Sequence, residues 1–285
     1  MRQLEYFIAI AEEQHFTRAA ARCHVSQSTI SASIAALERE LGTQVFVRDA
    51  RRVAITSAGS TFLTYARRAL ESIVEGRQAI SGSGALRGTL RIGTIQTLGV
   101  IDLPQVIARF HRTHPHVQIV LTHDAATALQ QATADDQLDL CIVDGAIDER
   151  HLVRHPLGTD TLHLIVPVDD PLAERPEIAL TDPALADREF LDYRTDSSLT
   201  AQIDIACTAA DLVRRVSCKT HSIQYLVDGI RHGLGLGILP QAAIATSGYN
   251  LIAVPLVPSL TRTISAATTR RHPPNPITSA FLDSV

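Results

Sequence analysis

The sequence predicts a small all-α head with a basic hairpin, then a long helix, then a larger α/β body. Three observations lead to this fold class. Residues 17–59 have the pattern of two helices, a turn and a hairpin, and residues 57–80 carry a continuous helical repeat. From Gly88 onward, apolar strand-like runs alternate with helical stretches, which is typical of an α/β arrangement.

Two helices separated by a short break are predicted in the head. Arg18–Cys23 is rich in small residues that allow a second helix to approach closely, and Thr17 stands at the N-cap position. The break is His24–Ser26, and Ser26 can cap the second helix. One apolar stripe of that helix faces inward until Gly42 ends it. Its residues are Ile30, Ile34, Leu37 and Leu41.

The other face of the second helix begins with short polar side chains, which suit contacts with base edges in a DNA major groove. Two short strands follow, Gln44–Val47 and Arg52–Ile55, and the arginines at their tip can contact phosphates. An ordinary helical subdomain with a solvated polar face is the alternative, but the order, spacing and basic hairpin together favour a DNA-binding module. The predicted DNA-binding residues are Thr17, Arg18, Ser26, Gln27, Ser28, Thr29, Ser31, Ser33, Arg48, Arg51 and Arg52.

The long helix predicts a dimer. Thr56 or Ser57 can cap it, and apolar residues recur at alternating spacings of three and four, as in a two-stranded coiled coil. The seam consists of Leu63, Ala66, Leu70, Ile73, Arg77 and Ile80. A head this small is not expected to bury the seam, so residues 59–80 should pair with a second copy, and two heads side by side predict an inverted-repeat DNA site. Ser81–Gly84 then breaks the helix as a hinge.

Charge is divided unevenly along the chain. Residues 1–88 hold 11 Arg and 8 acidic residues, a net charge of +3, and residues 89–285 carry a net charge of −7, within the overall −4. A mildly basic head on an acidic body is consistent with nucleic acid at one end only. No apolar run reaches membrane-spanning length and no signal-peptide pattern is present, so the predicted location is the cytoplasm, without a membrane partner.

The first 59 residues resemble the N-terminal domain of LysR-type transcriptional regulators. Six segments carry the resemblance: Leu4–Phe7, Phe16–Ala20, Val25–Ser28, Leu37–Gly42, Val45–Arg48 and Thr56–Gly59. The resemblance implies a winged helix-turn-helix in a homo-oligomer, a tetramer in many members, that responds to a small-molecule effector and acts with RNA polymerase. Many members carry Arg where this chain has Ala32, so the operator sequence is not transferable from relatives.

The resemblance continues more coarsely to the C-terminus and implies a domain division. Residues 1–58 would form the DNA-binding domain, 59–88 the dimerisation helix and hinge, and 89–285 a periplasmic-binding-protein-like effector domain. Subdomain I would comprise 89–161 and 265–285, and subdomain II 162–264, with two crossing segments around a cleft. The sequence predicts strands at 90–93, 117–121, 138–143, 162–168, 190–191, 213–216 and 236–239, and helices at 102–113, 125–135, 199–210 and 222–232.

A ligand site is expected where strands end, because ligands in open α/β sheets bind beyond the carboxyl ends of the strands. The segment after the first strand, Thr94–Leu98, leads towards a helix whose free N–H groups favour an anion or a polar oxygen. By the resemblance, the effector residues are Thr94, Ile95, Gln96, Thr97, Leu98, Thr127, Tyr193, Arg194, Thr195, Thr220, His221 and Ser222. Arg194 is the candidate carboxylate partner, with an ordinary ion pair as the alternative, and capping is the alternative for the threonines.

Cysteines and histidines predict neither redox chemistry nor a metal. In peroxide-sensing members of the family, the resolving thiol would correspond to Cys207, but the reactive thiol would fall at Ser198. Cys23 and Cys141 are expected to be packing residues, and no role is assigned to Cys218. The cluster His111, His114 and His116 could suggest a metal site, but a helix C-terminus favours histidine through its dipole alone.

Two other protein classes are less consistent with the sequence. An enzyme would need a recognisable nucleophile or acid–base setting, but the chain has no G-x-S-x-G, P-loop or H-E-x-x-H motif. The run His232–Gly237 lacks dinucleotide-loop spacing and is predicted to be a tight turn. A solute-binding receptor would share the body but would need no DNA-binding head. The predicted protein is therefore a DNA-binding regulator with a small-molecule effector and no cofactor.

Overall fold

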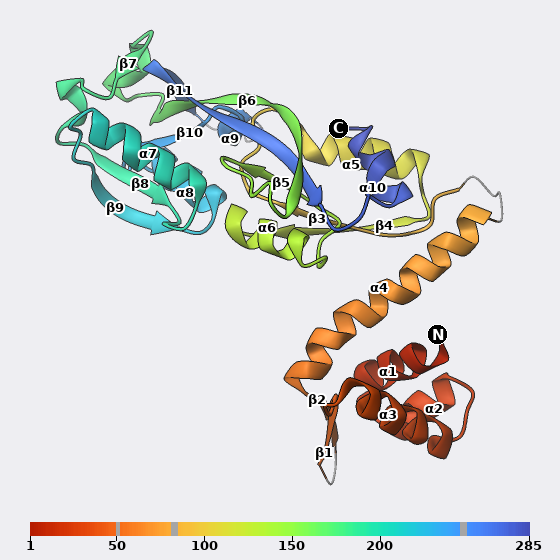
Figure 1. The fold of residues 1–285 in the computed structure, drawn as a ribbon. Coiled ribbons are helices and arrows are strands. Elements are labelled where there is room, and N and C mark those ends of the chain that lie inside the picture. Colours follow the sequence, from red (N-terminus) through yellow and green to blue (C-terminus); the bar gives the residue numbers. More distant parts are fainter. Residues whose placement is uncertain (50–51, 81–84, 246–249) are drawn as a thin grey trace. The chain divides into compact units, whose positions relative to one another are not determined.

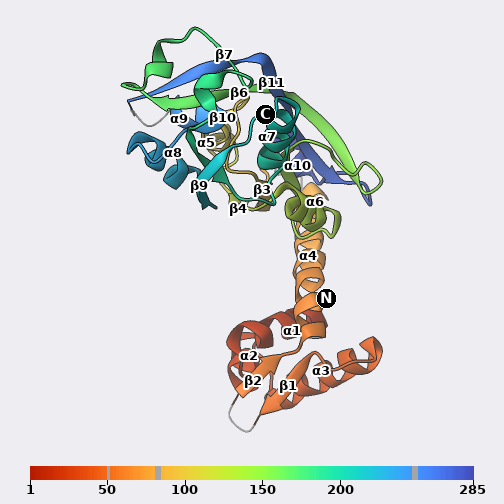
Figure 2. The same ribbon diagram turned by 90° about the vertical axis from the view of Figure 1, so that its left-hand side faces the viewer.

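The computed structural model describes residues 1–49, 52–80, 85–245 and 250–285, with the backbone alone for residues 48, 49, 52, 71, 75, 77–80 and 245. The chain forms two compact units, Met1–Gly88 and Thr89–Val285 (Figure 1, Figure 2). Each unit has its own hydrophobic core. The boundaries within these units, at residue 58 and between the two subdomains, stay predictions.

The first unit consists of short helices, a hairpin and a long helix. They are α1 (Arg2–Glu13), α2 (Phe16–Arg22), α3 (Gln27–Leu41), β1 (Phe46–Asp49), β2 (Arg52–Ile55) and α4 (Ser57–Ile80). Phe7 lies in the middle of its core, with its ring centroid 5.2 Å from those of Phe46 and Phe62. Ile30, Ile34 and Leu37 are buried as predicted, whereas Leu41, at the end of the stripe, is exposed.

The ends of α3 are where the sequence predicts them. The Ser26 hydroxyl accepts a hydrogen bond from the Thr29 N–H and caps the helix, and Gly42 ends it with a φ of 68°. Glycine adopts this left-handed conformation without steric cost. The caps and the α3 bounds therefore follow from local sequence.

Two local predictions in the head are wrong. Thr17 is not the cap of α2, because the helix begins at Phe16, where the side chain is buried, and His15 Nδ1 accepts the hydrogen bond from the Thr17 N–H. The first hairpin strand begins at Phe46 rather than Gln44, because its pairing ends with Phe46 opposite Ile55, and the next residue of the partner strand, Thr56, already caps α4.

Helix α4 has the predicted bounds, and the Thr56 hydroxyl caps it by accepting from the Gly59 N–H at 2.9 Å. The expectation that the head leaves its seam unburied is wrong for the first half of the helix. Ala66 is 2% exposed, and Leu63 packs against the core of the head. Ile73 and Val74 further along are 38% and 49% exposed. Apart from Tyr65, the apolar surface that α4 leaves open therefore begins near Leu70.

A seven-stranded mixed sheet is the framework of the second unit. Its order is β10-β6-β11-β5-β3-β4, and β7 pairs with β11. The strands are β3 (Gly88–Thr94), β4 (Val117–His123), β5 (Leu140–Asp144), β6 (Leu152–Pro167), β7 (Ile178–Ala179), β10 (Gly237–Pro240) and β11 (Leu251–Thr269). A separate parallel pair is formed by β8 (Glu189–Tyr193) and β9 (Arg215–Thr220).

Helices lie on both sides of β3 and β4 in the second unit (Figure 1). They are α5 (Leu103–Thr113), α6 (Ala126–Ala134), α7 (Ser198–Ala209), α8 (Ile223–Arg231), α9 (Ala242–Ala245) and α10 (Pro276–Leu282), with 3-10 turns at Pro171–Glu174 and Pro183–Leu185. Figure 1 shows α5 and α10 on one side of β3 and β4 and α6 on the other. The rings of Phe110 and Phe281 hold α5 to α10, with centroids 5.3 Å apart.

Strands β6 and β11 are the elements that sequence reasoning predicted least well. They pair antiparallel from Leu251 opposite Pro167 to Thr269 opposite Leu152, with irregularities after Pro255 and Ile264. The sequence predicts only the second half of β6 and none of β11. Pro255, Pro258 and the Thr-rich end of β11 interrupt the apolar run on which strand prediction depends.

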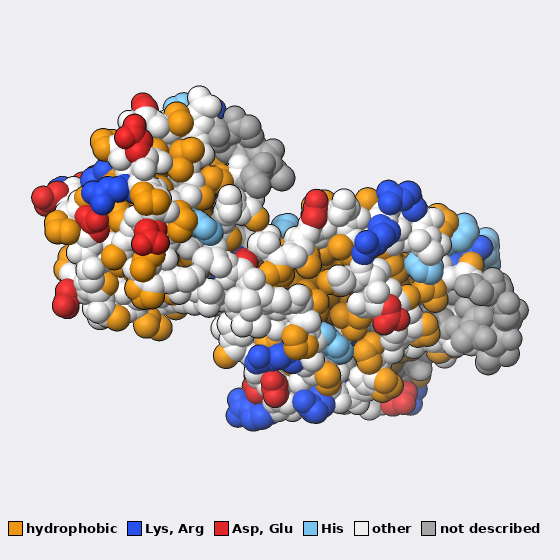
Figure 3. Space-filling model, turned by 90° about the horizontal axis from the view of Figure 1, so that it is seen from above, with side chains coloured by type: hydrophobic (Ala, Val, Ile, Leu, Met, Phe, Trp, Pro, Cys, Tyr) orange, Lys and Arg blue, Asp and Glu red, His pale blue; other side chains and the backbone are white. Residues whose placement is uncertain are grey.

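Charged side chains of both signs are scattered among hydrophobic ones on the face that Figure 3 shows, without a large patch of one sign.

Within the part of the chain that the structure describes, no helix is both long and apolar enough to cross a membrane.

Candidate functional site

The exposed start of α3 is the candidate nucleic-acid interface. Ser26, Gln27, Ser28 and Thr29 are all exposed there. The Thr17 hydroxyl donates to Gln27 Oε1 at 3.0 Å, so the starts of α2 and α3 lie side by side. This contact fixes the position of the longest polar side chain at the front of the helix.

The hydroxyls at this helix start have a structural role as well. Ser26 Oγ lies 2.8 Å from both Ser28 Oγ and Thr29 Oγ1. Ser31 and Ser33 are half-buried, and the carbonyl oxygen of Ser33 accepts from Gln3 Nε2 of α1 at 3.2 Å. Gln27 is therefore the residue on this surface whose side chain is least explained by capping or packing.

The structure places only part of the predicted DNA-binding arginines. Arg18 is exposed, and its guanidinium is engaged by Glu13, through a hydrogen bond to the carbonyl and an ion pair at 3.5 Å. Arg51 lies outside the described residues, as do the side chains of Arg48 and Arg52. The basic hairpin tip therefore stays a prediction.

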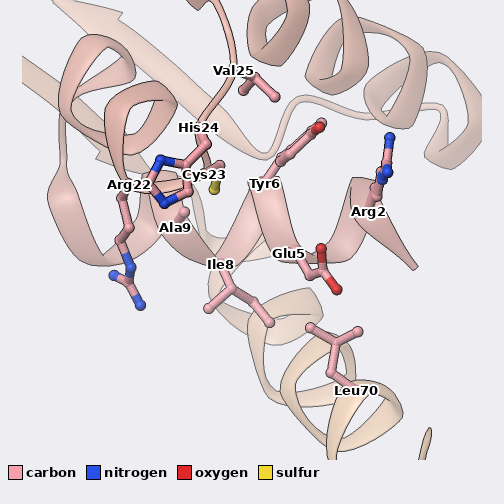
Figure 4. A pocket seen from close by; sticks show the side chains of 10 residues that line it. All are labelled: Arg2, Glu5, Tyr6, Ile8, Ala9, Arg22, Cys23, His24, Val25 and Leu70. Carbon is pink, nitrogen blue, oxygen red and sulfur yellow. The ribbon is translucent and has the colours of Figure 1, made fainter.

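A groove on the head lies beside this interface. Its walls come from α1, the α2–α3 turn and α4, and its volume is about 520 Å³. Figure 4 shows Ile8 of α1 and Leu70 of α4 on adjoining walls, with Cys23 and His24 at another side. Sequence reasoning did not predict this groove, because it forms between segments that are distant along the chain.

The candidate effector site is a small cavity in the second unit where strands end. The carboxyl ends of β3 and β5, which pair in parallel, supply residues of one side, and the end of β8 with the start of α7 supplies the other. Five predicted effector residues line it: Ile95, Gln96, Thr97, Tyr193 and Arg194. The cavity volume is about 10 Å³, which is roughly enough for a single water molecule.

The remaining predicted effector residues lie outside this cavity lining. The facing segment Thr220–Ser222 is joined to it through Gln96, whose Nε2 donates to the His221 carbonyl at 3.2 Å and whose Oε1 accepts from the Ile223 N–H at 3.1 Å. Thr127 lines a different surface pocket on α6. The Thr94 hydroxyl donates to the Ile95 carbonyl at 3.1 Å. Leu98 and Thr195 stay predictions.

Arg194 is engaged by carboxylates of the chain itself. Its Nη2 donates to Asp196 Oδ2 at 2.6 Å, with Nε bonded to the second oxygen, and Nη1 donates to Asp124 Oδ1 at 3.3 Å. The hydrogen bond to Asp196 is the main cause that raises the pKa of Arg194, and the same bond lowers the pKa of Asp196. Arg194 therefore forms the ordinary ion pair that the sequence analysis gave as the alternative to binding a ligand carboxylate.

A buried arginine in the lining of the cavity was missed by sequence reasoning. Arg262 of β11 is 4% exposed and binds Asp160 of β6 through Nε and Nη2, at 2.7 and 2.9 Å. Its Nη1 donates to Asp144 Oδ2 at 2.9 Å and to the Thr97 hydroxyl at 3.0 Å, and its Nη2 donates to the Thr97 carbonyl. These bonds join β11, β6 and the ends of β3 and β5.

The network also reaches the opposite side of the cavity. The Ser198 hydroxyl at the start of α7 donates to Asp144 Oδ1, so Asp144 links Arg262 to α7. A buried Asp at a strand end and a buried Arg on a long strand are the only sequence signals of this network. Asp144 follows a strand that the sequence predicts, but its partner Arg262 could not be found without knowing that β11 exists.

Comparison with known proteins gives the protein family. Residues 1–60 match the bacterial regulatory helix-turn-helix protein, lysR family, and residues 83–285 match the LysR substrate binding domain. The chain belongs to the LysR family. It is a DNA-binding transcriptional regulator with an effector-binding domain.

Several LysR-family relatives are regulators of the peroxide response. The chain is 33% identical over 246 residues to a hydrogen peroxide-inducible genes activator of Pectobacterium carotovorum subsp. carotovorum, covering 86% of this chain and 80% of the relative. It is 32% identical over the same length and coverage to the DNA-binding transcriptional dual regulator OxyR of Escherichia coli K12.

Solved structures agree with this fold over the whole chain. A full-length OxyR variant from Pseudomonas aeruginosa has a TM-score of 0.74 at 27% identity, covering 99% of this chain and 93% of that chain. Full-length CbnR in complex with its target DNA has a TM-score of 0.70 at 24% identity, covering 100% and 98%. Because the identity to CbnR is below 25%, that likeness supports the fold alone.

Two of the four thiols of this LysR-family chain, Cys141 and Cys207, are buried and poorly placed for redox chemistry. Cys207 is 3% exposed, and burial raises the pKa of its thiol. Burial also raises the pKa of Cys141 to about 11. The predicted position of the reactive thiol is occupied by Ser198, whose hydroxyl is bonded to Asp144. Because the thiolate is the reactive form, the buried thiols are expected to react slowly.

Among the described residues, no group of three or more His, Cys, Asp or Glu side chains is arranged so that it could bind a metal ion. His114, one of the three histidines considered for a metal site, packs its ring on Phe110 at a centroid distance of 4.7 Å.

Proposed function

We propose that this LysR-family regulator binds an interrupted inverted repeat as a homo-oligomer and senses a small, anionic metabolite in the cavity of its effector domain. The observation that carries the DNA part is the start of α3, which Ser26 caps and which the Thr17–Gln27 contact positions against α2. A capped helix start with exposed polar side chains can enter a major groove end-on and contact base edges.

A dimer formed through α4 would account for the inverted repeat in the DNA site. Its open apolar surface consists of Ile73 and Val74, with Tyr65 at 47% exposure. Leu70 connects this surface to the groove on the head, where a second copy would cover the half-buried Ile8, while Tyr6 and Ala9 are already buried in the core of the head. Such pairing brings two heads together by two-fold symmetry, so half-sites in inverted orientation follow. A tetramer and contact with RNA polymerase are further parts of the proposal.

An anionic effector would bind at Arg194. Asp196, which now holds the guanidinium, is 56% exposed, and Asp124 is 49% exposed. Asp196 holds the planar guanidinium in a bidentate pair, and a ligand carboxylate can take the same geometry and replace Asp196 there. The cavity must open for this, because its present volume is about 10 Å³.

Opening of the cavity would transmit the signal. A ligand that binds the open arrangement more tightly shifts the population towards it. The change would alter how the two subdomains and the linker place the DNA-binding heads, and so the footprint on DNA. A cytoplasmic location is a further part of the proposal, because the protein acts on DNA.

The test is a selection of genomic fragments by the purified protein at near-physiological salt, with and without a panel of small carboxylates and amino acids. We expect an interrupted inverted repeat to be enriched and one ligand to change the footprint. Enrichment of no sequence over random DNA contradicts the DNA part, and a footprint that no panel ligand changes contradicts the effector class.

Gln27→Ala is expected to weaken binding to the selected site by about 1–3 kcal/mol for the lost base contact. Binding to random DNA should stay the same, because a base contact contributes only on the correct sequence. Fluorescence anisotropy with both DNAs measures the two affinities. Arg51→Ala is the comparison, and it should weaken binding to both DNAs and flatten the salt dependence. Equal losses on both DNAs for Gln27→Ala would place base recognition elsewhere.

Hydrogen peroxide is expected to leave the footprint unchanged, in contrast to the activity for which the relatives are named. Ser198 has no thiol to oxidise, and Cys207 is buried with a raised pKa. Footprinting with and without peroxide, followed by mass spectrometry of the thiols, measures this. Reversible oxidation of Cys207 together with a shifted footprint, absent in Cys207→Ser, would mean that this chain senses peroxide.

A further inference from the structure

We infer that the effector carries, besides its carboxylate, a hydrogen-bond donor on the neighbouring carbon, so that the ligand is a 2-hydroxy or 2-amino acid whose donor binds Asp144. This inference rests on the proposed function and names the ligand class of the same cavity.

Asp144 is the acceptor that the cavity presents. It is 3% exposed, it lines the cavity, and each of its oxygens holds one donor from the chain. Oδ2 accepts from Arg262, and Oδ1 accepts from the Ser198 hydroxyl. A carboxylate offers about four lone-pair sites, so Asp144 can accept from a ligand in addition to Arg262. Ser198 is a neutral donor, and a ligand donor can replace it.

Arg262 does not serve as the anion partner in this cavity. Its five N–H groups donate to Asp144, to Asp160 and to the hydroxyl and carbonyl oxygens of Thr97. Two buried carboxylates face this one guanidinium, so the positive charge is more than compensated. A ligand carboxylate therefore has Arg194 as its partner, and Asp144 repels any ligand that brings only acceptors towards it.

The small size of the cavity favours a short ligand. Arg194 and Asp144 line the same cavity, which holds about 10 Å³ in this state. A ligand that bridges them with least opening has its donor on the carbon next to the carboxylate. Glycolate and glycine are the smallest such compounds, and acetate is the matched compound that lacks only the donor.

The experiment measures binding of glycolate, glycine and acetate to the full-length protein by isothermal titration calorimetry. A hydrogen bond to a buried carboxylate is expected to make glycolate or glycine bind roughly 10–100-fold more tightly than acetate. Equal affinities for the three compounds overturn the inference, as does binding by acetate alone.

A matched pair of variants separates recognition from stability. Asp144→Asn and Asp160→Asn each remove one carboxylate from Arg262, but only Asp144 lines the cavity. Asp144→Asn should abolish the preference over acetate, and Asp160→Asn should retain it. Loss of the preference in both variants would mean that the network acts only structurally, which overturns the inference.

Ser198→Ala keeps the test decisive if Asp144→Asn does not fold. Removing the hydroxyl frees Asp144 Oδ1, so glycolate should bind several-fold more tightly while acetate is unaffected. An unchanged glycolate affinity contradicts the proposed exchange of donors.

Arg194→Gln distinguishes this inference from the proposed function. Weaker binding of all three compounds with the preference retained supports both. No effect of Arg194→Gln, with the preference still sensitive to Asp144→Asn, would contradict the carboxylate site while supporting the donor site. If none of the compounds binds the native chain, the inference and the carboxylate site are both wrong, and fragment selection still decides the DNA part independently.

Discussion

Arg262→Met lowers the free energy of unfolding of the effector domain by about 3–5 kcal/mol, the cost that is typical of breaking a buried ion pair by removing one partner. Asp144 and Asp160 are 3% and 7% exposed, so both keep buried charges after the change. Each also loses hydrogen bonds of 2.7–2.9 Å. Methionine fills part of the volume but donates nothing, so packing alone cannot restore the stability.

Urea unfolding of the full-length protein, followed by circular dichroism, measures this loss. Arg150→Met is the control, because Arg150 forms an exposed pair with Asp148 at 2.8 Å and should leave the unfolding midpoint unchanged. The triple variant Arg262→Met, Asp144→Leu, Asp160→Leu should recover much of the stability, since no unpaired charge remains. An Arg262→Met variant as stable as the native chain would show that the two carboxylates find other partners.

The functional consequence reaches both sides of the cavity. Arg262 connects β11 and β6 to the strand ends, and Asp144 passes the connection to Ser198 of α7. We therefore expect the Arg262→Met variant, at temperatures where it is folded, to lose ligand discrimination while retaining binding to the selected DNA. The head has its own core, which the substitution does not touch.

Local signals explain why much of the fold was predictable. Ser26, Gly42 and Thr56 cap or end helices through bonds within a few residues, so the bounds of α3 and α4 follow from the sequence. The parallel strands of the body are short apolar runs between helices, and these were found with shifts of a few residues. Where a buried aromatic residue competes with a cap, as Phe16 does, local rules place the helix start wrongly.

The candidate site depends on pairings that are distant along the chain. Arg262 binds Asp144 across 118 positions and Asp160 across 102. Periodicity describes neighbours in sequence, so it could not bring these residues together. The predicted segments Ile95–Thr97 and Tyr193–Arg194 do line the cavity, because both follow strand ends, a position that can be recognised from sequence. Their partners could not be derived in this way.

Gly59→Ala and Gly76→Ala are expected to change stability in opposite directions, although both lie in α4. A Cβ at Gly59 would stand 2.2 Å from the Val45 carbonyl oxygen and 2.7 Å from Ile55 Cγ1. The Val45 carbonyl cannot move freely, because it accepts from the Thr56 N–H at 3.0 Å. The start of α4 must therefore shift away from the hairpin, at a cost of about 1–3 kcal/mol.

Gly76 provides the matched control within the same helix. No described atom lies within 4 Å of a Cβ at Gly76, so alanine there should stabilise the chain by roughly 0.5–1 kcal/mol through helix propensity. Urea unfolding of both variants gives the two signs, and DNA affinity gives the consequence. Because Gly59 lies where the hairpin meets the long helix, Gly59→Ala should also weaken DNA binding, whereas Gly76→Ala leaves that junction unchanged. Equal stabilisation by both substitutions would mean that the hairpin gives way to α4, and that this junction does not fix the position of the hairpin.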